Sequence, residues 1–449
     1  MGRTAPPDLL SSADHPAGHP GSPLFNLTGG LGSLVGVRPA ASPGVSQADG
    51  ATASARPILG EEMKGVLKVC REEFRSILSD SGAVLILFGA VVFYSIVYPI
   101  PYRPEVLKEV PVVVVDLDRS ALSRRLIRMV DANEYIRVAS RADTTLQAER
   151  EVLAGRVGGL LVVPEGFERD ILRGQQAHVG AFADASYLLV YRQVITGLLQ
   201  AARTLSAGIE IRRFRAGGMS EAQALAARDP LPLVLRPLFN PAMGYATYVV
   251  PAVLLLILQQ TLLIGIGMLS GTERETAAPG SVSIAKNISA FQIVLGKTAA
   301  YLALYVVHCF FYFGILYRVY HLPQRADPGT LMLFLLPFLI AIILMGLGLS
   351  NLFKHRETAM QALLFMSIPA IFLSGFAWPP EATPKWLRVL SCLLPSTPGI
   401  SGFLRVNQMG ASLQEVRFEW LVLWILCVFY LALAWGSVRR NLARFARRR

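Results

Sequence analysis

The sequence predicts an α-helical integral membrane protein with six transmembrane helices and an inserted extracytoplasmic α/β domain. Of the 449 residues, 53% are hydrophobic and only 16% are charged, whereas a soluble globular domain carries about 25% charged residues. Six long segments lack charged side chains except at an end, and the region between the first two alternates strand-like and helix-like patterns. The composition therefore excludes an ordinary soluble protein.

The six predicted spans are each long enough to cross a bilayer. A hydrocarbon core of about 30 Å requires about 20 helical residues, and a charge at the centre of a span costs about 2.5–3.5 kcal/mol on insertion scales. We therefore predict transmembrane helices over residues 81–102, 243–270, 298–318, 330–352, 358–378 and 419–438.

The positive charges predict the orientation. The tail 439–449 reads RRNLARFARRR, and Lys354 and Arg356 follow the fourth span. Because Lys and Arg accumulate in cytoplasmic loops, we expect both termini in the cytoplasm of a bacterium and the chain in its inner membrane. Residues 271–297 are then cytoplasmic and residues 103–236 are extracytoplasmic.

The N-terminal residues divide into two segments. Residues 1–57 are rich in Gly, Pro, Ala and Ser, and we expect a disordered cytoplasmic tail, with translation from Met63 as an alternative. Residues 58–80 show apolar side chains at spacings of three and four. This pattern predicts an amphipathic helix that lies at the membrane interface or packs on protein.

Two segments predicted to be extracytoplasmic have patterns that indicate their structure. VPVVVVD, YIRVA and VGGLLVVP are strand-like and are separated by helical patterns, so residues 103–236 predict βα units closed by a long helix over about 187–215. In residues 379–416, the prolines of WPP and LLPSTP predict broken, re-entrant helical pieces before the last span.

One motif raises the possibility of an enzyme. Asp116 and Asp118 end a predicted buried strand, and a DxD pair at such a place can hold a divalent metal against a nucleotide-sugar diphosphate. A membrane glycosyltransferase is therefore one alternative. The competing interpretation is structural, because Asp118 or Ser120 can cap the following helix.

Other chemical signals are weaker. Gly296, Lys297 and Thr298 resemble the end of a P-loop, but Phe291 stands where the loop needs its first glycine, so we expect Lys297 to extend to the inner membrane surface instead. His308 lies within the third span, where a buried neutral histidine most often satisfies a neighbouring helix. The four scattered cysteines indicate no metal site or disulfide framework, and no basic–aromatic platform indicates nucleic acid.

Several segments together resemble one family. They are REEFRSILSDSGAVLILF, VVVVDLDRSALSRRL, GRVGGLLVVPEGFERDILRG, RPLFNPAMGYATYVVPAV, the ERE cluster followed by GK, and SGFAWPPEATPKWLRVLSCLLPSTPGISGFLR. In this order and spacing, the chain resembles a permease subunit of the ABC-2 type of ATP-binding-cassette transporter, in the subgroup with a large extracytoplasmic domain between the first two spans.

The resemblance implies an exporter whose ATP and Mg are bound by a separate ATPase, with no cofactor in this chain and a second permease chain, identical or not. In such exporters a coupling helix between the second and third spans docks into the ATPase. Here the corresponding residues are Glu273, Arg274 and Glu275 as a charged flank and Ile284, Ile288 and Phe291 as an apolar ridge at i, i+4 and i+7. The apolar spans suggest a drug-like or lipid-like substrate. A membrane-anchored scaffold or receptor, whose external domain binds a partner, is the other alternative.

Overall fold

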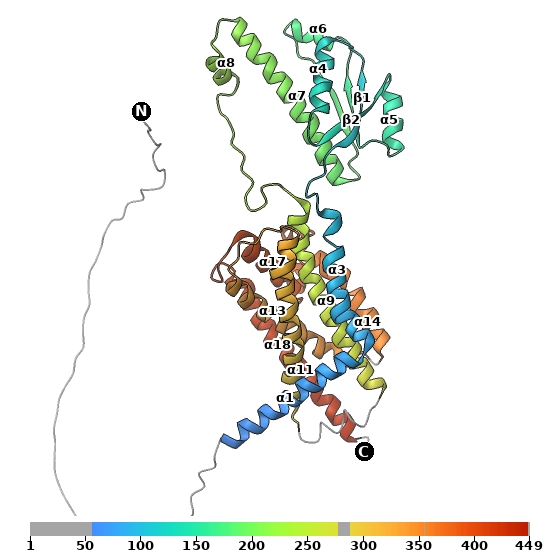
Figure 1. Ribbon diagram of the computed structural model, residues 1–449, viewed down its shortest axis with the longest axis vertical. Coiled ribbons are helices and arrows are strands. Elements are labelled where there is room, and N and C mark those ends of the chain that lie inside the picture. Colours follow the sequence, from blue (N-terminus) through green and yellow to red (C-terminus); the bar gives the residue numbers. More distant parts are fainter. Residues whose placement is uncertain (1–55, 277–287, 354, 448–449) are drawn as a thin grey trace, which may run out of the picture. The chain divides into compact units, whose positions relative to one another are not determined.

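The computed structural model describes residues 56–276, 288–353 and 355–447, and the chain is mostly helical in these parts (Figure 1). Five helical segments are long and apolar enough to cross a membrane, or six if one bent pair counts as a span. The five are Ser81–Tyr102, Tyr245–Glu275, Ala290–Val319, Pro328–Leu349 and Arg417–Ala443.

The first and third spans change helix type along their length. The first consists of α2 (Ser81–Val84), the π-helix η1 (Leu85–Ala90), α3 (Val91–Val97) and the 3₁₀ turn η2 (Ile100–Tyr102), and the third of α11 (Ala290–Phe310), the π-helix η3 (Phe311–Leu316) and α12 (Tyr317–Val319). The remaining three spans lie in α9 (Tyr245–Glu275), α13 (Pro328–Leu349) and α18 (Arg417–Arg447).

The segment predicted as the fifth span is not one continuous helix. It forms α14 (Arg356–Phe365) and α15 (Ser367–Leu373), which are separated at Met366. Pro369 accounts for the break, because a proline ring clashes with the carbonyl four residues earlier, here that of Phe365.

The sixth candidate span lies in the segment predicted as re-entrant. There α16 (Lys385–Ser391) is followed by α17 (Ser396–Leu404) and the π-helix η6 (Arg405–Met409), and the pair is bent by 87°. Short 3₁₀ turns, η4 (Ser350–Leu352) and η5 (Pro380–Ala382), lie on either side of α14 and α15.

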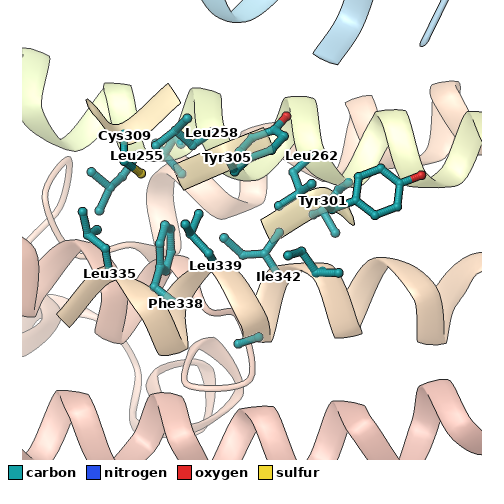
Figure 2. Close-up of a cluster of buried hydrophobic side chains, with 14 of the residues drawn as sticks. Leu255, Leu258, Leu262, Tyr301, Tyr305, Cys309, Leu335, Phe338, Leu339 and Ile342 are labelled. Carbon is teal, nitrogen blue, oxygen red and sulfur yellow. The ribbon is translucent and has the colours of Figure 1, made fainter. Parts of the chain in front are cut away.

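The core of the helical bundle is centred on α13, which packs against α9, α11, α17 and α18. Figure 2 shows side chains of three of these helices meeting: Leu255, Leu258 and Leu262 of α9, Tyr301, Tyr305 and Cys309 of α11, and Leu335, Phe338, Leu339 and Ile342 of α13. Glycines of α17 stand against Phe334 and Phe338, where an added Cβ would collide with the rings. Small residues of this kind let membrane helices approach closely.

Between the first two spans the chain forms a four-stranded sheet with strand order β2-β1-β3-β4 (Figure 1). Strand β1 is parallel to β2 and β3, and β4 is antiparallel to β3. The elements are β1 (Val110–Asp116), α4 (Ala121–Asp131), β2 (Ile136–Ala142), α5 (Thr145–Leu153), β3 (Gly159–Val163), α6 (Phe167–Leu172), β4 (Gly180–Ala183), α7 (Leu188–Ala216) and α8 (Glu221–Arg228).

The central strand explains the apolar run VPVVVVD. Val112 and Val114 pack with α4 and α7 on one face of the sheet, whereas Val113 and Val115 pack with α5 on the other. Both faces of β1 are therefore covered, and a strand covered on both faces has no position for a polar side chain.

Candidate functional site

The segment between α9 and α11 is called the connector below. The ERE cluster predicted to flank it lies in the last turn of α9, and each member of the cluster contacts another part of the chain. Glu273 binds the Lys297 ammonium at 2.6 Å, and Glu275 accepts a hydrogen bond of 2.9 Å from the backbone N–H of Arg356. The Arg274 guanidinium donates to the carbonyl of Phe353. These contacts fix the start of the connector to the rest of the bundle.

Lys297 does not extend to the membrane surface as the sequence suggested. Its side chain is 14% exposed, and its ammonium lies 2.6 Å from Glu273 and 2.9 Å from Glu73 of α1 (Arg56–Ser79). Tyr301, one turn further along α11, donates a 2.7 Å hydrogen bond to the other oxygen of Glu73. Two carboxylates from different helices therefore hold one ammonium, and no snorkelling is needed.

Glu73 occupies the buried face of α1. Val69, Glu73 and Ile77 recur every four residues and are 6%, 4% and 0% exposed, so the carboxylate lies on an otherwise apolar stripe that packs on α11. Burial raises the pKa of Glu73, the Lys297 ammonium and the Tyr301 hydroxyl lower it, the neighbouring Glu273 carboxylate raises it, and the pKa is raised overall. The predicted amphipathic helix is thus packed on protein along this face.

Gly296 allows α11 to lie close against α1. A Cβ at this position would lie 2.6 Å from Cβ of Val69 and 2.8 Å from the carbonyl oxygen of Val66, both in α1. Thr298 donates a 2.7 Å hydrogen bond to the carbonyl of Val294 within its own helix. The GKT triplet is therefore a helix-packing element, with glycine for close approach and lysine for the buried ion pair.

A second ion pair lies at the same end of the bundle. Asp80, at the N-cap of α2, accepts hydrogen bonds from both terminal nitrogens of Arg356 at 2.8 and 2.9 Å, and from the N–H of Ala83 at 2.9 Å. Burial raises the pKa of Asp80, but these donors outweigh burial and lower it overall. We call Glu73, Asp80, Glu273, Lys297 and Arg356 the ionic layer.

Of the predicted apolar ridge, the structure describes Ile288 and Phe291. Ile284 lies outside the described residues. Ile288 precedes α11, whose N-cap Ser289 forms a capping box with Gln292, so Ile288 and Phe291 do not share one helix. Phe291 is 50% exposed in the first turn of α11. It is thus the member of the ridge that the structure presents at the surface.

The two aspartates of the DxD pair serve the local fold. Asp116 accepts hydrogen bonds from the N–H of Arg119 and the hydroxyl of Ser123, and Asp118 accepts one from the N–H of Glu168 at the start of α6. Ser120, not Asp118, caps α4. Burial raises the pKa of Asp118, but hydrogen bonds from Ser120 and the start of α6 outweigh it and lower the pKa.

Metal ligation finds no support in the described residues, which contain no group of three or more His, Cys, Asp and Glu side chains placed to hold a metal. His308 lies 2.9 Å from the Leu87 carbonyl and packs edge-on against Tyr305 and Phe88, as expected of a histidine that satisfies a neighbouring helix.

Five to six candidate spans, three of which have a residue of the ionic layer in them or directly before them, define a multi-pass membrane protein. The family model for ABC-2 family transporter proteins matches residues 81–435, and the chain belongs to this family.

Two relatives are similar over different lengths. The "Probable multidrug ABC transporter permease YbhR" of Escherichia coli (strain K12) is 28% identical over 199 residues, which cover 44% of this chain and 52% of that protein. The match thus spans about half the length of that relative. The "Inner membrane transport permease YhhJ" of Escherichia coli (strain K12) is 22% identical over 391 residues, or 86% of this chain and 99% of that protein.

Proposed function

We propose that the chain is the membrane-spanning permease subunit of an ABC exporter that moves a drug-like or lipid-like substrate across the bacterial inner membrane. A separate ATPase subunit binds ATP and Mg and drives transport, and a second permease chain completes the transporter. The names of the two relatives, a multidrug permease and an inner-membrane transport permease, support this class.

The observation that carries the proposal is the ion pair that joins the two ends of the connector. Glu273 before it and Lys297 after it are bonded to each other, and Lys297 also binds Glu73 of α1. A force that displaces the connector therefore acts on α1, α9 and α11 together. In this proposal the connector faces the cytoplasm and the sheet domain lies outside.

Two glutamines of the bundle are candidates for lining the substrate path. Gln259 and Gln260 lie near the middle of α9, and amide atoms of both are buried without a hydrogen-bond partner in the described chain. Polar groups inside a membrane are costly and typically mark pathways or helix contacts. They are the polar groups that a substrate, or the second permease chain, could satisfy.

Copurification tests the proposal. Phe291→Asp places a charge on the exposed apolar side chain next to the connector, and we expect it to release a P-loop ATPase that accompanies the wild-type chain in mild detergent. Phe182→Asp is the matched control, because Phe182 is also exposed, at 56%, but lies in β4 of the sheet domain.

Two results would contradict the proposal. One is ATPase retained by Phe291→Asp at the wild-type level, and the other is nucleotide hydrolysis by the purified chain alone. Absence of any ATPase from the wild-type preparation would favour the receptor alternative.

A further inference from the structure

A cavity of about 560 Å³ lies at the end of the bundle opposite to the ionic layer. Its walls come from the end of the first span, the linker that follows it, the first turns of α7 and the approach to α9. This volume is within the range of small-molecule sites, about 300–1,000 Å³.

Hydrogen bonds hold the walls in place. The carboxylate of Glu105 accepts bonds from the backbone N–H of Thr247 at 3.1 Å and from its hydroxyl at 2.8 Å. The backbone carbonyl of Glu105 accepts the N–H of Tyr245 at 2.7 Å, and the Asn240 amide bridges to Gly244 in both directions. The site is therefore built before any ligand arrives.

The lining residues are mostly apolar or aromatic, and the three tyrosines among them, Tyr102, Tyr245 and Tyr248, form a continuous ring cluster with centroid separations of 5.2 and 6.3 Å. Flat, rigid rings of this kind offer contact area at low cost in side-chain entropy. They suit the apolar body of a ligand.

Two polar side chains on α7 have no strong partner. Gln193 is only 9% exposed, and its amide makes no hydrogen bond within the described residues. The guanidinium of Arg192 donates to the sulfur of Met243 at 3.1 Å, and a thioether is a weak acceptor. The other charged lining residue, Glu105, already has both carboxylate oxygens occupied.

We propose that this cavity binds an anionic amphiphile, with the carboxylate, sulfate or phosphate of the ligand at Arg192 and Gln193 and its apolar body against the three tyrosines. The guanidinium and the amide both line the cavity, and together they supply several N–H donors for such an oxyanion. The inference rests on the geometry of this chain alone and does not depend on the proposed ATPase coupling.

The test uses the full chain in nanodiscs of zwitterionic phosphatidylcholine. The probe is 11-(dansylamino)undecanoate, and its methyl ester is the neutral comparison; dansyl fluorescence is measured after subtraction of empty nanodiscs. We expect the acid to bind about tenfold more tightly than the ester, because hydrogen bonds to a charged oxyanion are stronger than those to a neutral ester.

Four variants make the test specific to the cavity. Arg192→Ala should remove the preference for the acid, and Tyr245→Ala should weaken acid and ester alike. Arg203→Ala is the matched control, because Arg203 is exposed on the same helix but does not line the cavity. Arg192→Glu should reverse the preference toward a dansyl-alkylamine of the same length.

Equal binding of acid and ester by the wild-type chain would overturn the proposal, as would an unchanged preference in Arg192→Ala or an equal loss in Arg203→Ala. If the proposal holds, displacement of the probe by phosphatidylglycerol in the nanodisc identifies the ligand source as anionic membrane lipid. Retention of the probe identifies a free amphiphile. Neither result depends on ATPase copurification, so the two proposals fail separately.

Discussion

The buried pair of Glu73 and Lys297 is the residue-scale feature with the largest energetic consequence. A surface ion pair contributes little, but removal of one partner from a buried pair leaves an uncompensated charge and costs about 3–5 kcal/mol. The side chains of Glu73 and Lys297 are 4% and 14% exposed, so this pair belongs to the second class.

We expect Lys297→Met to lower the thermal midpoint of the detergent-solubilised chain strongly, because Glu73 is left buried with Tyr301 as its remaining donor. The double variant Glu73→Gln/Lys297→Met should recover much of the loss, since no buried charge is left unpaired and Glu273, the other carboxylate at Lys297, is 38% exposed to solvent. Lys68→Met is the control, as Lys68 is exposed on the same helix α1. Equal midpoints for Lys297→Met and Lys68→Met would show that the buried pair contributes nothing.

At the residue scale, only one partner of this buried pair can be predicted from the sequence. A glutamate on an apolar helical stripe is a readable signal, and Glu73 stands between Val69 and Ile77 at spacings of four. Its partner is 224 positions away, and no local pattern joins two such residues. The sequence therefore predicts Lys297 at the membrane surface, the usual place for a lysine at the end of a span.

At the scale of elements, close contact between α1 and α11 depends on Gly296. We expect Gly296→Ala to push α1 away, because the added Cβ would meet the backbone of Val66 and the side chain of Val69 at 2.6–2.8 Å. Overpacking of this kind costs about 1–3 kcal/mol. Amide hydrogen exchange should become faster in α1.

Gly314→Ala is the matched control, since an added Cβ there meets no atom within 4 Å. Unchanged exchange in α1 of Gly296→Ala, or the same increase in Gly314→Ala, would contradict the role of Gly296 in this contact.

The elements differ in how well the sequence predicts them. Charge-free length locates five spans, and the run VPVVVVD identifies a strand covered on both faces. The segment 358–378 is equally apolar, yet Pro369 divides it into α14 and α15. Hydrophobicity alone cannot distinguish a continuous helix from a broken one, whereas the proline could have been used as a signal.

At the scale of the whole molecule, the proposed orientation can be tested with the native cysteines. Cys392 is exposed beside α16, and Cys70 is half-buried in α1. In intact cells a membrane-impermeant maleimide should label Cys392 and leave Cys70 unlabelled, because only the former faces outward in the proposed topology. Labelling of Cys70 in intact cells would show that the proposed orientation is wrong.

Labelling of Cys70 in permeabilised cells is the positive control for this experiment, and its rate depends on pH. Burial raises the pKa of the Cys70 thiol, with a smaller contribution from Glu73, and the thiolate is the reactive form. In permeabilised cells we therefore expect slow labelling of Cys70 at neutral pH and faster labelling as the pH rises toward 9. Buried Cys309 and Cys427 should stay unlabelled throughout.

The contact between Glu273 and Lys297 also has a consequence for how such a protein can diversify. These two side chains join the end of α9 directly to the start of α11, so the contact between the two helices has a link of its own apart from the backbone. If the proposed ATPase coupling holds, replacement of the residues between Glu273 and Lys297 would change ATPase recognition and leave this ion pair in place. Recognition of the motor could then evolve with little effect on the contact between α9 and α11.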